Sequence, residues 1–236
     1  MNVKSYLFYL GLVLVLPIHA FSQTNTSYAT LMADRAMSMW KDSMTTSGKP
    51  AKWSYDQSVI LKGIYDLWTA TGERRYFDYI EKSMDFFVGD SGAIRTYKPE
   101  DLALDNIAPG WDLLLLYNVT GKRKYYQAVQ ALRSQLQQQP RTSKGGVGHK
   151  KAYPSQMWLD GLYMAEPFYV EYARTFHEDS DYLDIARQYI LMENHARDPS
   201  TGLFYSGYDG SNVQKWADPH TGDSPNFWGR AMGWYG

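Results

Sequence analysis

A helical hairpin recurs along the chain, and this repeat strongly limits the folds that the sequence can adopt. The apolar segment 64–68 leads into a polar turn with Gly72, and segment 115–119 leads into a matching turn with Gly121, about 50 residues later. A looser copy spans residues 168–182. Each copy reads as an apolar helix, a short turn and an amphipathic helix that opens on a tyrosine, and glycine suits the left-handed position after a helix. A repeated hairpin of this kind indicates a solenoid or a closed toroid of hairpins.

The inner helices of these hairpins favour the closed toroid. Segment 111–117 is apolar nearly all round, as expected of a helix buried in a shared core. Helices are predicted near residues 28–42, 56–70, 74–88, 107–119, 122–138, 155–175 and 180–195, and a further inner helix begins at Phe227. This set is about half of a twelve-helix barrel, and the last predicted helix reaches only its second turn at Gly236. We therefore expect either a truncated chain or another covering for the apolar faces.

The loops that precede the inner helices are expected to carry the functional site. Segments 98–109, 142–154 and 198–225 are the richest in Gly, Pro and Lys, and each lies before an inner helix. In a toroid of hairpins such loops gather at one end, where a site can be built on a rigid scaffold.

The N-terminus has the order of a secretory signal peptide. Lys4 precedes an apolar run at 6–17, and small and polar residues follow at 20–23. The run is too short for a membrane span and lacks the amphipathic period of a buried first helix. We predict a signal peptide over residues 1–20, cleaved near Ala20, and a single domain over 21–236. Because the chain has no cysteine, it can form neither a disulfide nor a lipid-anchored cysteine, so we expect an exported protein, periplasmic or secreted, without a membrane anchor.

The overall composition is that of a globular domain and narrows the function only slightly. Hydrophobic residues make up 44% of the chain and charged residues 21%, with a net charge of −1, so nothing points to nucleic acid as a partner. The aromatic content of 16% fits a sugar-binding cleft and equally a well-filled helical core. The histidines are scattered without metal-ligand spacing, and no phosphate loop or Ser-His-Asp set can be assembled, so no metal or cofactor is expected.

Asp160 is the most unusual charged residue, because it lies in the apolar stretch "MWLDGLYM" at 157–164. An ionised carboxylate in such surroundings is costly unless it is paired or keeps its proton. Gly161 follows directly, and a glycine within a helix suggests a close approach by backbone or ligand. Asp160 is therefore either a general acid with a raised pKa or a structural aspartate paired with a neighbour.

Other charged residues near the loops also have both a structural and a functional interpretation. Asp105 precedes Pro109 and an apolar helix, where an aspartate commonly caps a helix or forms a turn. His149 and Lys150 stand in a loop that is either simply solvated or close to an anionic substrate. Arg230, set among tryptophans and glycines, either pairs with a buried carboxylate or binds a ligand carboxylate.

Two long motifs resemble glycoside hydrolase family 105. These are "HKKAYPSQMWLDGLYMAEPFYVEYA" at 149–173 and "WADPHTGDSPNFWGRAMGWY" at 216–235. The members of that family are unsaturated rhamnogalacturonyl hydrolases, and they are related to the unsaturated glucuronyl hydrolases of family 88. The resemblance covers nearly all of the predicted mature chain. It implies an all-α fold, an (α/α)6 barrel or six-hairpin toroid, of which this chain holds roughly the first half to two-thirds.

The resemblance also implies roles for individual residues. Asp160 corresponds to the catalytic aspartate, and Asp105 to a second aspartate of the site. The residues that it implies for substrate binding are His149, Lys150, Trp158, Arg230, Trp234 and Ser206. In the family mechanism C4 of the C4=C5 double bond is protonated and water adds at C5, which differs from the usual displacement by two carboxylates. Such a role requires Asp160 to hold a proton at working pH. Burial would favour this, because it raises the pKa of a carboxyl.

The sequence departs from the family pattern at two places. Ser206 stands where the family usually has a histidine that binds substrate or positions water, and the C-terminal third of the barrel is missing. The resemblance thus predicts hydrolysis of unsaturated galacturonyl-rhamnose oligosaccharides from pectin, with the activity of this chain dependent on those departures. An unsaturated glucuronyl hydrolase acting on glycosaminoglycan fragments and a non-catalytic sugar-binding toroid remain as alternatives.

Overall fold

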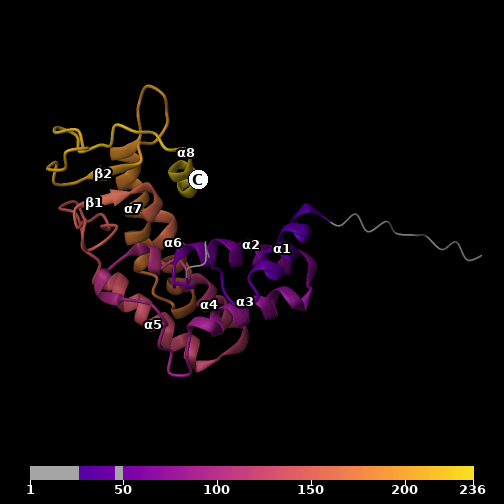
Figure 1. The fold of residues 1–236 in the computed structure, drawn as a ribbon. Helices are drawn as coiled ribbons and strands as arrows, with labels where there is room; N and C mark the ends of the chain where they lie inside the picture. Colours follow the sequence, from indigo (N-terminus) through magenta and orange to yellow (C-terminus); the bar gives the residue numbers. More distant parts are fainter. Residues whose placement is uncertain (1–26, 46–49) are drawn as a thin grey trace, which may run out of the picture.

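The computed structural model describes residues 27–45 and 50–236, which form a mainly helical chain (Figure 1). The predicted signal peptide lies outside the described residues. The α-helices are α1 (Tyr28–Met39), α2 (Tyr55–Thr71), α3 (Arg74–Phe87), α4 (Gly110–Thr120), α5 (Arg123–Gln137), α6 (Leu159–Phe176), α7 (Asp181–Ala196) and α8 (Gly229–Tyr235). Two 3-10 turns, η1 (Pro99–Asp101) and η2 (Leu104–Asn106), and two strands, β1 (Gln156–Trp158) and β2 (Gly207–Asp209), complete the elements. Within the described ranges, no helix is long and apolar enough to cross a membrane.

The predicted hairpin repeat is confirmed. Helices α2 and α3, α4 and α5, and α6 and α7 pack as consecutive pairs. The first two pairs turn at glycines with positive φ, Gly72 at 71° and Gly121 at 66°. The looser third copy uses His177, whose φ of 57° places a non-glycine residue in the same left-handed conformation. The shared turn geometry keeps each outer helix against its own inner helix.

The core lies along the inner helices. Contacts run from α2 to α4, from α4 to α6 and from α6 to α8, so successive inner helices are neighbours. Leu61, Leu113 and Phe168 are fully buried between them. The outer helices bury one face only, as Tyr76 and Tyr125 show at their N-terminal turns. The periodicity of the sequence therefore predicted correctly which helices are inner and which are outer.

The prediction of one helix over residues 155–175 is wrong at its start. Gln156–Trp158 form strand β1, which pairs antiparallel with β2 in the register Gln156 with Asp209 and Trp158 with Gly207. Trp158 is extended, with φ of −113° and ψ of 145°, and helix α6 begins only at Leu159. Asp160 therefore lies in the first turn of α6, where the free backbone N–H groups favour a carboxylate more than the middle of a helix does.

The loops before the inner helices gather at one end, as predicted. The backbone N–H of Leu104 donates to His149 O (3.1 Å), and the N–H of Lys151 donates to Asp101 O (3.2 Å). The N–H of Gly210 donates to Ser155 O (2.8 Å). These bonds join the three loops directly, because each crosses from one loop to another.

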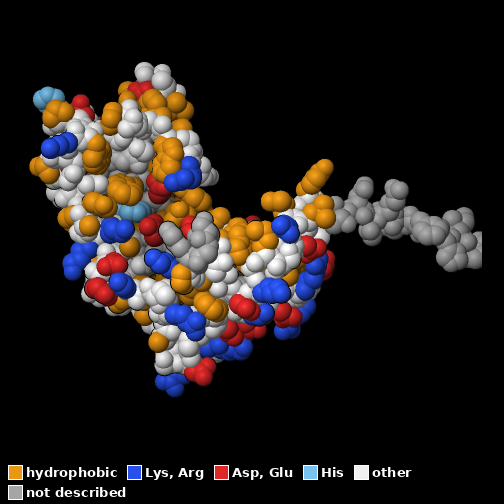
Figure 2. Space-filling model, in the orientation of Figure 1, with side chains coloured by type: hydrophobic (Ala, Val, Ile, Leu, Met, Phe, Trp, Pro, Cys, Tyr) orange, Lys and Arg blue, Asp and Glu red, His pale blue; other side chains and the backbone are white. Residues whose placement is uncertain are grey.

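The described part of the chain is open on one side. In the space-filling view an arm containing α1 and an arm containing β1, β2 and α7 stand on either side of a broad notch, with hydrophobic side chains along it (Figure 2). On α1, Tyr28 is 88% exposed and Met32 is 72% exposed. Such an apolar surface is larger than the scattered exposed side chains of an ordinary monomer, which agrees with hairpins that do not close into a ring within these residues.

Candidate active site

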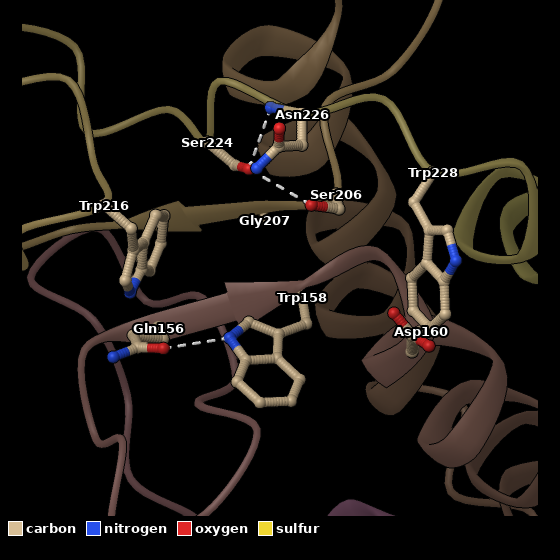
Figure 3. A pocket seen from close by; sticks show the side chains of 9 residues that line it. All are labelled: Gln156, Trp158, Asp160, Ser206, Gly207, Trp216, Ser224, Asn226 and Trp228. Atoms are coloured by element: carbon tan, nitrogen blue, oxygen red, sulfur yellow. Dashed lines mark hydrogen bonds between the residues drawn. The ribbon is translucent and has the colours of Figure 1, made fainter.

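A cavity of about 280 Å³ opens between strand β1, the first turn of α6 and the segment after β2. Figure 3 shows the side chains that line it. The lining residues are Gln156, Trp158, Asp160, Ser206, Gly207, Trp216, Ser224, Asn226 and Trp228. Three of the predicted site residues thus share one cavity: Asp160, Trp158 and Ser206. Its mixture of aromatic rings, amides, hydroxyls and a single carboxyl suits a hydroxylated ligand.

The short sheet brings the residues of the cavity together. Successive side chains of a strand point to opposite faces, so Gln156 and Trp158 line the cavity while Met157 is buried behind them. The indole N–H of Trp158 donates to Gln156 Oε1 (3.0 Å), which fixes the edge of the ring (Figure 3). On the neighbouring strand Gly207 offers no side chain, and a Cβ there would stand 3.2 Å from Trp158 Cδ1. The glycine therefore leaves room for the indole.

Burial raises the pKa of the Asp160 carboxyl above its ordinary value. The backbone of its own helical turn and the charges of His149 and Arg230 oppose that rise, and the charge of Asp105 adds to it. The direction is that of a carboxyl which keeps its proton longer than a solvated aspartate does. The structural interpretation requires Asp160 to pair with a neighbouring arginine or tyrosine. Among the described residues, Asp160 forms no hydrogen bond or ion pair with either.

His149 joins Asp105 to the cavity. Its side chain is buried, its Nε2 lies 3.6 Å from Asp105 Oδ1, and its ring stacks on Trp158 with centroids 4.4 Å apart and an interplanar angle of 17°. Burial opposes ionisation of Asp105, but the nearby His149 and Lys150 outweigh it, and they lower the pKa of that carboxyl. The pKa values of Asp105 and Asp160 therefore move in opposite directions, the pattern by which one carboxyl acts as an acid while the other stays charged.

Gly161 allows His149 to approach α6. A Cβ at residue 161 would lie 3.1 Å from His149 Nδ1 and 3.2 Å from Leu104 Cδ1, closer than most real Cβ contacts, so these neighbours would have to shift. The close approach expected from the sequence is made, among the described residues, by the side chains of His149 and Leu104. It holds the imidazole between the first turn of the helix and the ring of Trp158.

We expect Gly161→Ala to lower kcat/KM by about 10- to 100-fold, because the added methyl group must displace the imidazole that faces Asp105. Gly63→Ala is the matched control, since Gly63 also lies inside a helix and a Cβ there meets nothing within 4 Å. That control should keep full activity and gain up to about 1 kcal/mol of stability. Steady-state kinetics and denaturant unfolding on both variants make the comparison. Equal kinetics in the two variants would show that the position of His149 is unimportant.

The predicted uronate pair lies beside the cavity, not in its wall. Arg230 is exposed, and its guanidinium lies 3.9 Å from the centroid of the Trp228 ring, which does line the cavity. Trp234 packs against Tyr163 and Tyr55, with centroids 4.6 Å and 6.2 Å away. The roles expected of Arg230 and Trp234 in binding remain predictions. The contact that the structure offers Arg230 is with the face of Trp228, which holds the cation near the mouth of the cavity.

Of the cavity wall opposite strand β1, the sequence predicted Ser206 but not Trp216, Ser224 or Asn226. Ser206 Oγ and Ser224 Oγ lie 3.1 Å apart, and the N–H of Asn226 donates to Ser224 Oγ (3.2 Å). Trp216 completes this wall. The sequence signal that could have indicated this wall is the position of Trp216. It is a tryptophan in a polar loop with Gly and Pro, where it is not needed to fill a core.

Two of the buried carboxyls outside the cavity, those of Asp112 and Glu166, have oxygens without hydrogen-bond partners among the described residues. Neither oxygen of Asp112, in the first turn of α4, has a hydrogen-bond partner within the described ranges, and Glu166 Oε2 in α6 also lacks one. Burial raises the pKa of each to about 8. The described residues contain no group of three or more histidine and acidic side chains that could hold a metal ion.

Comparison with known proteins identifies relatives among the glycoside hydrolases. Residues 28–236 match the family model described as Glycosyl Hydrolase Family 88. The chain is 27% identical over 188 residues to the unsaturated rhamnogalacturonyl hydrolase YesR of Bacillus subtilis, a match that covers 77% of this chain and 51% of YesR. This chain thus spans about half the length of that curated relative.

Solved structures show the same fold. A glycoside hydrolase of family 105 from C. acetobutylicum is 41% identical, with a TM-score of 0.81 over 88% of this chain and 56% of that one. A possible member of family 105 from Klebsiella pneumoniae is 18% identical, with a TM-score of 0.69 over 99% of this chain and 62% of that one. The predicted fold is confirmed: the hairpins are those of a six-hairpin toroid, of which this chain spans a part.

Proposed function

The chain belongs to glycosyl hydrolase family 88, and from this premise we propose that it hydrolyses unsaturated galacturonyl-rhamnose oligosaccharides, the products of lyases that act on pectin rhamnogalacturonan. The name of YesR assigns an activity of this kind to that relative. The observation that carries the proposal is the pair of carboxyls: Asp160 in the cavity wall with a raised pKa, and Asp105 beside His149 with a lowered one.

Asp160 is proposed to act first as the acid. Its carboxyl donates a proton to C4 of the C4=C5 double bond, and the positive charge develops at C5 and the ring oxygen. The carboxylate that remains takes a proton from water as the water oxygen bonds to C5. The resulting hemiketal opens and releases the aglycone. One carboxyl can perform both transfers because it ends the cycle protonated again.

Asp105 is proposed to support this cycle as the charged partner. A carboxylate that stays ionised near the reacting atoms stabilises positive charge at C5, and its neighbour His149 keeps it oriented. Trp158, which stacks with His149 and Tyr153 and donates to Gln156, forms the part of the wall beside which the sugar ring is proposed to lie. Arg230, above Trp228, is placed to attract the uronate carboxylate at the cavity mouth. The export signal predicted for residues 1–20 would fit such a substrate, since pectin fragments lie outside the cytoplasm.

A side-by-side assay tests the proposal. The full chain is given unsaturated galacturonyl-rhamnose, an unsaturated glucuronyl disaccharide from a glycosaminoglycan, and the saturated form of the first. Loss of the double bond's ultraviolet absorbance is followed for the unsaturated pair, and release of the aglycone for all three. We expect turnover of the first substrate at a rate at least tenfold above the second, and none of the third. Preference for the glycosaminoglycan product would point to a glucuronyl hydrolase, and binding without turnover to a sugar-binding toroid.

A further inference from the structure

A second cavity adjoins the candidate active site. It has a volume of about 600 Å³, roughly twice that of the first, and the two share Trp216 and Ser224 in their walls. Figure 3 shows Trp216 at the end of the first cavity that is farthest from Asp160 and Trp228. A ligand that starts at Asp160 and extends past Trp158 therefore reaches Trp216 and the second cavity next.

Trp216 is held in place by its loop while its ring keeps a free face. The buried Asp209 accepts hydrogen bonds at Oδ2 from the N–H groups of Val213 and Gln214 (both 2.9 Å), and the N–H of Ala217 donates to Gln214 O (3.1 Å). The backbone on both sides of Trp216 is thus fixed. Within the described ranges no other aromatic ring stacks on its indole, and the half-buried residue lines both cavities, so its ring is accessible from them. A rigid indole with a free face is a ready platform for the apolar face of a sugar ring.

The charges of the second cavity disfavour an anionic ligand. Its wall contains two carboxyls, Asp218 and Asp223, and a single guanidinium, Arg197. Arg197 already forms an ion pair with Glu193 and lies over the ring of Phe204, 5.6 Å from its centroid. A ligand carboxylate entering this cavity would therefore meet like charges without a free cation to offset them.

We infer that the second cavity is the site of the aglycone, that Trp216 stacks on its ring, and that Asp218 and Asp223 select a neutral sugar over an acidic one. The inference rests on the proposed function, because it takes the unsaturated uronate to lie at Asp160. It assigns specificity for the leaving group to a loop that is separate from the carboxyls of the reaction.

Two substrates of equal length test the inference: unsaturated galacturonyl-rhamnose, with a neutral aglycone, and unsaturated galacturonyl-galacturonate, with an acidic one. In the full chain, Trp216→Ala should raise KM for the neutral substrate on the order of tenfold with kcat changed less than about twofold, because only ground-state stacking is lost. Trp216→Phe should restore most of the affinity. Val213→Ala, at a 74% exposed position of the same loop, is the control and should change nothing.

Asp218→Asn tests the charge separately. Asp218 Oδ1 accepts from the N–H groups of His220 (2.8 Å) and Thr221 (2.9 Å), and an asparagine oxygen can keep both bonds. The variant should raise the ratio of kcat/KM for the acidic substrate to that for the neutral substrate several-fold. Unchanged ratios in Asp218→Asn together with an unchanged KM in Trp216→Ala would overturn the inference, as would a loss confined to kcat.

Failure of the proposed function would be recognised separately. If the wild type turns over neither substrate, that function is wrong, and titration of the saturated galacturonyl-rhamnose disaccharide by calorimetry still tests the second cavity. Weaker binding by Trp216→Ala than by Val213→Ala would support the inference, and equal binding by both would overturn it.

Discussion

Replacing Asp160 by asparagine should lower kcat by several orders of magnitude, about 10³-fold or more, while the substrate still binds. The amide has nearly the shape of the carboxyl but can neither deliver a proton to C4 nor take one from water. KM should change little, because Trp158 and the aromatic wall of the cavity remain. Loss of the ultraviolet absorbance of the double bond measures turnover, and calorimetric titration measures binding.

Asp112→Asn is the matched control for that experiment. Asp112, like the half-buried Asp160, lies in the first turn of an inner helix and has a pKa raised by burial, yet it is fully buried and does not line the cavity. Its substitution should leave kcat within about twofold of the wild-type value. If Asp160→Asn instead keeps the specific activity of the folded fraction and loses stability, Asp160 is a structural residue and the mechanism fails with it.

The helices were predictable because their signals are local. A helix of three or four turns shows its period within its own sequence, and Gly72 and Gly121 mark the turns where the chain reverses. Strand β1 was not predictable in this way. Three residues are too few to show a strand period, and the partner strand Gly207–Asp209 lies far along the chain. The apolar run into α6 therefore resembled one continuous helix, and only the long-range pairing separates strand from helix.

The candidate site was predictable in part for the same reason. Asp160 stood out because a carboxyl in an apolar stretch requires a chemical explanation. Trp216 and Ser224 did not, since they come from a loop without a period, and only the pairing of β1 with β2 brings them to Gln156 and Trp158. The burial of Asp112 was equally hidden. An aspartate in the first turn of a helix is ordinary in sequence, and nothing local shows that neighbouring helices seal it from water.

The protein should lose stability as the pH rises from about 4 to about 8, and the buried carboxyls of Asp112 and Glu166 should account for most of that loss. Burial raises the pKa of Asp112 from 3.8, and of Glu166 from 4.5, to about 8 in the folded state. Below the pKa of the unfolded chain, the folded and the unfolded states both hold the proton, and the two carboxyls do not reduce the free energy of unfolding. Between the two pKa values the unfolded chain releases protons that the folded protein keeps, so each group costs on the order of 1 kcal/mol per pH unit. The loss is complete above the folded pKa.

Asp112→Asn should therefore flatten the pH dependence and make the variant more stable than the wild type at pH 8. Asparagine cannot ionise, so the variant avoids the cost of either charging the buried carboxyl or keeping its proton at high pH. The Ser58 hydroxyl, which donates to Ala108 O (3.2 Å), keeps its own partner in the variant. Glu166→Gln should also raise the stability at pH 8, and the effects of the two substitutions should add unless the residues interact.

Asp66→Asn, at an exposed aspartate of α2, is the control and should keep the wild-type slope of stability against pH. Denaturant unfolding at intervals from pH 4 to pH 9 gives these slopes directly. If the slope of Asp112→Asn is as steep as that of the wild type, Asp112 is already ionised in the folded protein and the prediction is wrong.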